Sequence, residues 1–327
     1  MRKGMISWAG RQEHLNSSYW RRVWDLVYPW LVYQGVVTLV MMALSAYLLI
    51  TQPQILDTIQ GLGDSTTVLN ELMQKHYVLI ALLGCAFTIP LLLLFIKKDR
   101  QKEQREAFQM EHWQRTGFLS FFLCFLLGIS SCIVLNHVLI YSGLYDLLAE
   151  GFEDTAQTLY QGRLLPELIS IGILTPVVEE LLFRGLAYRR IRWYLDALPA
   201  MLVSALLFAV FHGNLLQGIY AFTMGLLMAF VYERTHHILA PICVHVGGNL
   251  LSVLFSDIPG LGRIYDNENE TAFLLLTAAM MLLFTAAFYL FYTRVHPSRV
   301  EKQAKEPAYL QGNKEEDKEE NDGTRTI

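Results

Sequence analysis

Long apolar runs constrain this chain more than any other feature of its sequence. Stretches of about 20 mostly apolar residues recur along it, and charged residues lie mainly in the short segments between them. A helix of about 20 residues spans the hydrocarbon core of a bilayer. Because no water binds backbone groups there, each crossing segment has to be helical. The pattern therefore predicts an all-α fold, a polytopic membrane helix bundle.

We predict about eight transmembrane helices within one membrane domain, residues 26–296. The runs are approximately Trp30–Ile50, Tyr77–Ile96, Gly117–Tyr141, Leu164–Ala187, Leu198–His212, Leu215–Tyr232, Ile238–Phe255 and Ala272–Thr293. The first begins too late and extends too far for a cleaved secretory signal, so we interpret it as an uncleaved anchor. Residues 1–25 form a leader, and residues 297–327 form a charged tail that we expect to be disordered.

The connections between the runs alternate in charge, and this alternation predicts their orientation. Lys and Arg are concentrated in the leader, in the connections after the second, fourth and sixth runs, and after the last run. Acidic residues dominate the other long connections, 51–76, 142–163 and 256–271. Because basic connections stay on the cytoplasmic side, we place both termini in the cytoplasm. We expect a multi-pass protein of a bacterial plasma membrane.

The composition argues against several other classes of protein. Only 17% of the residues are charged and 53% are hydrophobic, whereas a soluble domain has about 25% charged residues. A net charge of -4 offers no broad basic surface to nucleic acid. The four cysteines, Cys85, Cys124, Cys132 and Cys243, lie in apolar runs without a CxxC pair. We predict that they are buried, reduced thiols.

Ionisable side chains within the fourth run indicate a functional site, since each costs about 2.5–3.5 kcal/mol at the centre of a span. This run contains Glu179-Glu180-xxx-Arg184. The i,i+4 spacing places Glu180 and Arg184 on one face, where the guanidinium can hold the carboxylate. Glu179 points about 100° away from Glu180. We therefore expect Arg184 to neutralise Glu180 and Glu179 to remain available for chemistry.

Two more i,i+4 pairs follow in later runs. Phe208 and His212 share a face of the fifth run, and His245 and Asn249 share a face of the seventh. Gly247 and Gly248 lie between the last two and permit close approach of a backbone or a substrate. Each pair alone fits a structural role, such as a salt bridge, a buried histidine or a contact between helices. Three such pairs on three neighbouring helices indicate one shared site.

These residue types suit the hydrolysis of an amide bond. A carboxylate and an imidazole can activate water, with Glu179 accepting the proton and His212 assisting. A second imidazole and a carboxamide, His245 and Asn249, can donate hydrogen bonds to an oxyanion. Zinc is an open alternative, with Glu179, His212 and His245 as ligands. No HExxH helix is present to supply two ligands, and spacing alone does not separate the two mechanisms.

The ordered set Glu179-Glu180-xxx-Arg184, Phe208-xxx-His212 and His245-xxx-Asn249 resembles the motifs of the CPBP intramembrane proteases. This family is also called Abi, or the type II CAAX prenyl endopeptidase and bacteriocin-processing family. The similarity covers roughly residues 164–255, and we identify no family signature in the first three runs or the tail.

The resemblance implies an intramembrane endopeptidase with catalytic and supporting residues. It assigns the base role to Glu179 with His212, and oxyanion stabilisation to His245 with Asn249. Glu180, Arg184 and Phe208 would support the site. We favour a glutamate-dependent mechanism that requires no cofactor and keep a zinc metalloendopeptidase open.

The resemblance also implies a peptide or membrane-protein substrate met within the lipid bilayer. We do not transfer the trimming of prenylated proteins to this chain, and the sequence does not indicate an oligomeric state. A non-catalytic membrane scaffold or a bacteriocin self-immunity protein on the same fold is the main alternative. A proton-coupled transporter is less favoured, because the polar cluster occupies only one half of the chain.

A shared site imposes one geometric requirement. His212 lies roughly 20 Å from Leu198 along a helix, near the predicted outer end of the fifth run. Glu179 and His245 fall toward the cytoplasmic half of their runs. The fifth helix must therefore begin deeper, tilt strongly, or have boundaries other than those predicted.

Overall fold

The computed structural model describes residues 18–52, 54–55, 65–105, 117–160, 163–258, 260–261 and 270–295. The predicted disordered tail and most of the predicted leader lie outside these residues. Every regular element that the model describes is helical, so the predicted all-α class is confirmed. The main helices are α2 (Tyr19–Thr51), α4 (Ser65–Lys75), α5 (Tyr77–Arg105), α6 (Phe118–Tyr141), α7 (Leu144–Leu159), α11 (Ala197–Val210), α12 (Leu215–Thr235), α13 (Leu239–Asp257) and α14 (Glu270–Arg294).

Within the described ranges, six helices are long and apolar enough to cross a membrane: α2, α5, α6, α12, α13 and α14. They coincide with six of the eight predicted runs. The helix α2 begins earlier than predicted, because Ser18 caps it by accepting a hydrogen bond from the backbone N–H of Arg21. The predicted connections also contain two helices, α4 and α7, which were not predicted because they lack a long apolar run.

The fourth predicted run is a helical path that changes its geometry four times. It consists of α8 (Leu164–Ile169), the π-helix η1 (Ser170–Leu174), α9 (Thr175–Glu180), the π-helix η2 (Leu181–Tyr188) and α10 (Arg189–Arg192). π-Helical turns are rare and frequently mark functional sites. The glutamates of the first motif lie on α9, between the two π segments.

The fifth predicted run ends earlier than expected. The helix α11 has 14 residues and stops at Val210, so His212 lies in the turn before α12 rather than on the helix. A helix of this length rises about 21 Å, less than the bilayer core of about 30 Å. The predicted boundary at His212 was therefore wrong. Phe208 of α11 nevertheless contacts both His212 and His245 of α13, so the second and third motifs are adjacent.

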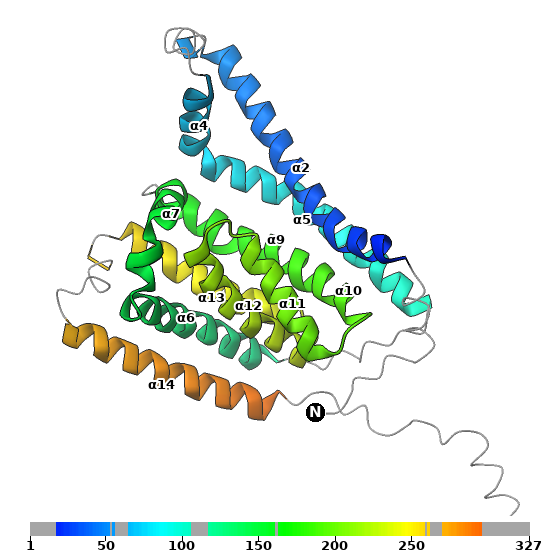
Figure 1. Cartoon of the computed structure of the whole chain (residues 1–327), viewed down its shortest axis with the longest axis vertical. Helices are drawn as coiled ribbons and strands as arrows, with labels where there is room; N and C mark the ends of the chain where they lie inside the picture. The colour runs from blue at the N-terminus through cyan, green and yellow to red at the C-terminus, as the bar shows by residue number, and fades with distance from the viewer. Residues whose placement is uncertain are drawn as a thin grey trace, which may run out of the picture.

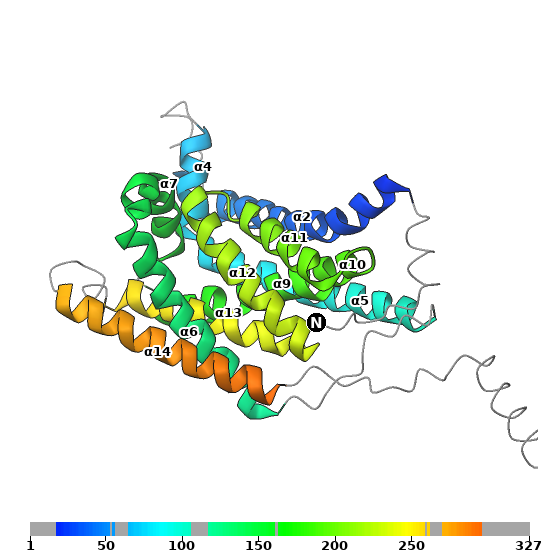
Figure 2. The ribbon, with the colours of Figure 1, turned by 60° about the horizontal axis from the view of Figure 1, so that its bottom comes forward.

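The helices are arranged around the broken path from α8 to α10. α13 packs along α6 and also contacts η1 and α9, while α14 covers the other side of α6 (Figure 1). α11 and α12 form an antiparallel pair, and α2 pairs with α5 on the opposite side of the bundle from α14 (Figure 2). All four cysteines are free thiols, as predicted, with three buried and Cys243 half-buried.

Buried ion pairs fix the end of the broken path at α10. Arg189 pairs with Glu103, and Arg190 pairs with Asp99 at 2.7 Å, so α10 is tied to the end of α5. Arg190 also donates to the hydroxyl oxygen of Tyr28 on α2, at 2.7 Å. Buried charges are tolerated only when they are paired and hydrogen-bonded. These contacts therefore set the position of α10 relative to α2 and α5.

Glycines bring α6 and α13 into backbone contact. A Cβ atom on Gly128 would lie 1.9 Å from the carbonyl oxygen of Val244, and one on Gly247 would lie 2.5 Å from that of Phe125. Both distances are impossible for real side chains, so the two helices can approach this closely only with glycine at both positions. The close approach holds His245 and Asn249 beside the centre of the bundle.

This packing predicts different effects for two neighbouring glycines. Gly247→Ala should lower the free energy of unfolding by about 1–3 kcal/mol, because helix backbones must separate to admit the methyl group. At Gly248 the nearest atom to an added Cβ is the methyl carbon of Met224 at 3.5 Å, an ordinary contact. Gly248→Ala should therefore leave the stability unchanged or raise it slightly. Thermal unfolding in detergent compares the two variants, and equal melting temperatures would contradict the packing described here.

Candidate active site

The charged pair predicted on the fourth run is present and fully buried. Arg184 donates from Nη1 to Oε1 of Glu180 at 2.8 Å, and both side chains are 0% exposed. Its Nη2 donates to the carbonyl oxygen of Gly225 on α12, at 2.9 Å. A Cβ on Gly225 would lie 3.4 Å from this nitrogen and 3.2 Å from Ala205. The guanidinium thus fills a space between the broken path, α11 and α12.

One imidazole bridges the two adjacent glutamates. The Nδ1 atom of His245 lies 3.0 Å from Oε1 of Glu180, and its Nε2 atom lies 3.5 Å from Oε2 of Glu179. Since a carboxylate only accepts hydrogen bonds, Nδ1 is the donor in the contact with Glu180. The side chain of Glu179 is 24% exposed, whereas that of Glu180 is completely buried. Glu179 is therefore the accessible carboxylate of the two, as predicted.

The ring of Phe208 joins the second motif to the first and third. It lies edge-on to the ring of His212, with centroids 4.6 Å apart, and edge-on to that of His245, at 5.5 Å. The guanidinium carbon of Arg184 lies 4.7 Å from the centre of the same phenyl ring. Both imidazoles thus contact one buried aromatic ring that also covers the buried ion pair.

His212 and Asn249 make hydrogen bonds to backbone carbonyl groups. Nδ1 of His212 donates to the carbonyl oxygen of Phe208 at 2.7 Å, which leaves Nε2 as the acceptor of the neutral ring. Asn249 donates from Nδ2 to the carbonyl oxygen of Ile171 in η1, at 3.1 Å. These bonds orient both side chains. Direct side-chain contacts therefore join Glu179, Glu180, Arg184, Phe208 and His245, and His212 joins them through Phe208.

The zinc alternative requires a group of ligands around one point. Among the residues that the structure describes, no three His, Cys, Asp or Glu side chains gather where they could hold a metal ion. Both ring nitrogens of His245 face carboxylates, and the Nδ1 atom of His212 bonds a backbone oxygen. The arrangement of Glu179, His212 and His245 does not fit a three-ligand zinc site.

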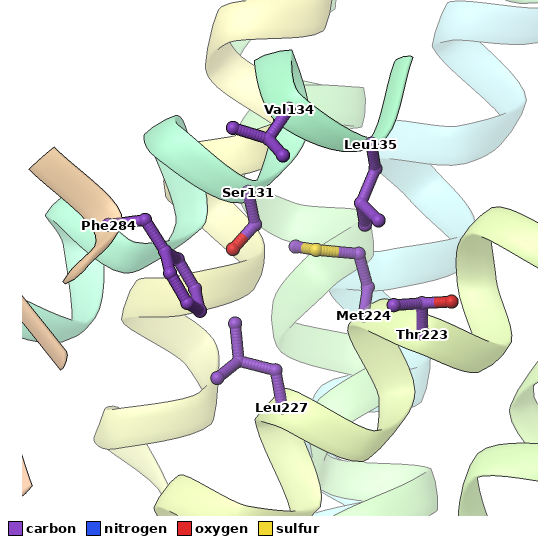
Figure 3. A pocket seen from close by; sticks show the side chains of 7 residues that line it. All are labelled: Ser131, Val134, Leu135, Thr223, Met224, Leu227 and Phe284. Carbon is purple, nitrogen blue, oxygen red and sulfur yellow. The ribbon is translucent and has the colours of Figure 1, made fainter. Parts of the chain in front are cut away.

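A partly open hollow elsewhere in the bundle is not this site. It has a volume of about 240 Å³ and lies between α6, α12 and α14, lined by Ser131, Val134, Leu135, Thr223, Met224, Leu227 and Phe284 (Figure 3). Its lining is almost entirely apolar and includes none of the predicted site residues. Met224 lies between this hollow and Gly248 on α13. The lining of this hollow therefore includes neither of the carboxylates.

Residues from the first half of the chain lie near the site, although no sequence motif in that half predicted this. Cys85 on α5 hydrogen-bonds Thr175, one turn before Glu179 on α9. Tyr33 of α2 and Tyr77 of α5 lie within electrostatic range of the Glu179 carboxylate. Their only sequence signal is the presence of polar aromatic residues in otherwise apolar runs, which is too common to point to a site.

The fold and the site together define a helical membrane protein whose interior holds a glutamate, arginine and histidine cluster. Residues 161–251, which contain every predicted site residue, match the family model "Type II CAAX prenyl endopeptidase Rce1-like". The family resemblance expected from the three motifs is therefore confirmed. This region of the chain is similar to that family.

Two relatives extend this comparison. The chain is 25% identical over 214 residues to "Putative membrane peptidase YdiL" of Bacillus subtilis, across 64% of this chain and 82% of the relative. It is 30% identical over 128 residues to "Uncharacterized 24.3 kDa protein" of Escherichia coli, across 36% of this chain and 59% of the relative. The chain thus spans less than two thirds of the second relative. No solved structure gives a significant match.

The buried pair generates a prediction about stability. Arg184→Gln leaves the Glu180 carboxylate fully buried without its guanidinium and should cost about 3–5 kcal/mol. The control Arg294→Gln alters an exposed arginine at the end of α14 and should change stability by no more than about 0.5 kcal/mol. Unfolding in detergent measures both.

The pairing itself is tested by a second substitution. Adding Glu180→Gln to Arg184→Gln should recover part of the loss, since no charge then stays buried without its partner. A double variant as unstable as the sum of its two single variants would show that the two side chains do not depend on each other.

Proposed function

We propose that this chain is an integral membrane endopeptidase that hydrolyses a peptide bond at a site inside the helix bundle. The observation that carries the proposal is the asymmetry of the two adjacent glutamates. Arg184 neutralises the buried Glu180, while Glu179 stays partly accessible with an imidazole nitrogen 3.5 Å away. An accessible carboxylate in an apolar surrounding, beside a histidine, is suited to act as a general base.

The reaction begins with a water molecule held against the carboxylate of Glu179. Glu179 accepts a proton from this water while the oxygen attacks the carbonyl carbon of the substrate, and the carbonyl oxygen becomes an oxyanion. The Nε2 atom of His212 is an acceptor when Nδ1 bonds Phe208, so it can hold the second hydrogen of the same water. The proton on Glu179 then passes to the leaving amine as the peptide bond breaks.

His245 and Asn249 are proposed to stabilise the oxyanion. Asn249 has two N–H donors, and its contact with Ile171 uses one of them. His245 donates from Nε2 when both of its nitrogens carry protons, and the carboxylates on either side then balance its charge. Fixed donors of this kind act strongly where water is excluded. The substrate class is a peptide or a membrane protein, and both termini of the chain are proposed to be cytoplasmic.

The base role of Glu179 is tested by removing its charge without changing its shape. Glu179→Gln should lower kcat by about 10²–10⁴-fold with little change in melting temperature, because this side chain is not part of the buried ion pair. His212→Asn should also lower kcat. The measurement is mass spectrometry of a peptide library after incubation with protein purified in detergent. Glu270→Gln, at the exposed start of α14, is the matched control and should retain full activity.

The outcomes of this test separate the competing functions. Hydrolysis that persists in both Glu179→Gln and His212→Asn would remove the peptidase assignment from this site. A non-catalytic scaffold or immunity protein would keep its biological function in both variants. A proton-coupled carrier would show flux in proteoliposomes that is lost with Glu179.

Metal removal distinguishes the glutamate mechanism from a zinc mechanism. A site that uses Glu179 as the base, with no metal, should keep its activity after treatment with a chelator, and purified protein should contain zinc well below one ion per chain. Activity that disappears with the chelator and returns with added zinc would show a metal-dependent enzyme. The same preparation of wild-type protein serves for both measurements.

A further inference from the structure

The face of α9 that carries Glu179 is turned toward α5. Thr175 and Glu179 are four residues apart on this helix and so share a face. Thr175 is hydrogen-bonded to Cys85 of α5, and α5 packs along both η1 and α9. Glu179 therefore lies on a face of α9 that is turned toward α5, a helix that carries no family motif, while its carboxylate also approaches His245 of α13.

Tyr77 begins α5 about two turns before Cys85, and its phenol interacts electrostatically with both Cys85 and Glu179. Tyr33 on α2 interacts electrostatically with the same groups, Glu179, Tyr77 and Cys85. Val37, one turn after Tyr33, lies against Gly84, where a Cβ would be only 3.3 Å from its methyl carbon. The close contact of α2 and α5 at this point turns the Tyr33 side of α2 toward Cys85.

A third contact fixes this part of α2 beside the second motif. The ring of Trp30 stacks on that of Phe211, with centroids 4.8 Å apart, and Phe211 directly precedes His212. The ring of Phe211 also lies 5.5 Å from that of Phe183 on η2. The side of α2 that carries Trp30, Tyr33 and Val37 thus lies over the site, between the turn that holds His212 and α5.

Tyr77 also lines an open hollow on the surface. The hollow has a volume of about 350 Å³ and is bounded by Gln74, Tyr77, Thr155, Thr158 and Leu159. Its walls come from α4, the start of α5 and the end of α7, which lie at the same end of the bundle in both views (Figures 1 and 2). The lining residues include an amide, two hydroxyl groups and a phenol, and these are groups that can bind a peptide backbone.

We infer that Tyr33 and Tyr77 are substrate-binding residues of the proposed peptidase, and that an extended peptide reaches Glu179 through the hollow between α4, α5 and α7. This inference rests on the proposed function and adds the direction of approach and two contacts outside the family-matched region. An ionised carboxylate only accepts hydrogen bonds, so Glu179 cannot hold a peptide carbonyl. The two phenol O–H groups, which interact electrostatically with Glu179, supply donors for that purpose.

The test removes each hydroxyl and nothing else. Tyr33→Phe and Tyr77→Phe should each raise KM about three- to tenfold, the loss of one neutral hydrogen bond to the substrate, with kcat within about twofold of wild type. Tyr47→Phe, an exposed tyrosine on the same helix α2, is the matched control and should leave both constants unchanged. Melting temperatures measured alongside separate binding from folding, because a purely structural role would lower stability without changing KM.

Two results would overturn the inference while leaving the proposed function intact. One is a wild-type KM in both Tyr33→Phe and Tyr77→Phe, together with an inactive Glu179→Gln. The other comes from a photoreactive substrate peptide bound to Glu179→Gln, if it cross-links away from α4 and α7. Cross-links in 70–77 or 152–160 are expected. A wild-type protein that cleaves no peptide in the library would instead overturn the proposed function, and this inference with it.

Discussion

The structure depends on one buried ion pair, Glu180 with Arg184. Two charges in a water-free interior are stable only if each has a close partner and further hydrogen bonds. Here the guanidinium also binds the Gly225 carbonyl of α12 and lies over Phe208 of α11, while the carboxylate also binds His245 of α13. Moving α12 or α13 away would leave a hydrogen-bonding group without its partner, and moving α11 away would remove the aromatic ring that covers the guanidinium. The pair therefore sets the relative positions of four helical segments that are remote in the sequence.

The same pair determines how Glu179 can act. Adjacent residues on a helix point about 100° apart, and the sequence predicted different partners for the two glutamates. The structure confirms that Arg184 pairs with Glu180, yet both glutamates approach His245. This is feasible because an imidazole presents its two nitrogens in different directions, so two diverging carboxylates can flank one ring. Arg184 thus neutralises the charge of Glu180, and Glu179 is the carboxylate that stays accessible.

Local patterns in the sequence predicted the parts of the structure that depend on local physics. Apolar runs predicted the six long helices because the bilayer demands a fixed length of apolar helix. The i,i+4 spacing predicted the pairing of Glu180 with Arg184, because residues four apart are neighbours on a helix surface. The sequence could not predict that α11 stops at Val210 or that π segments flank α9, because tertiary packing determines both. The electrostatic interactions of Tyr33 and Tyr77 with Glu179 are equally long-range, and no periodicity reveals them.

The broken path from α8 to α10 explains why the chain needs helices outside the family-matched region. A π turn departs from the regular hydrogen bonding of an α-helix, so a path with two such segments is held less firmly by its own backbone. Side chains at both ends compensate. Glu167 accepts from the backbone N–H of Arg163 at the start, while Arg189 and Arg190 bind Glu103 and Asp99 of α5 at the end. The motif helices supply the proposed reactive groups, and α2 and α5 hold the broken path in position.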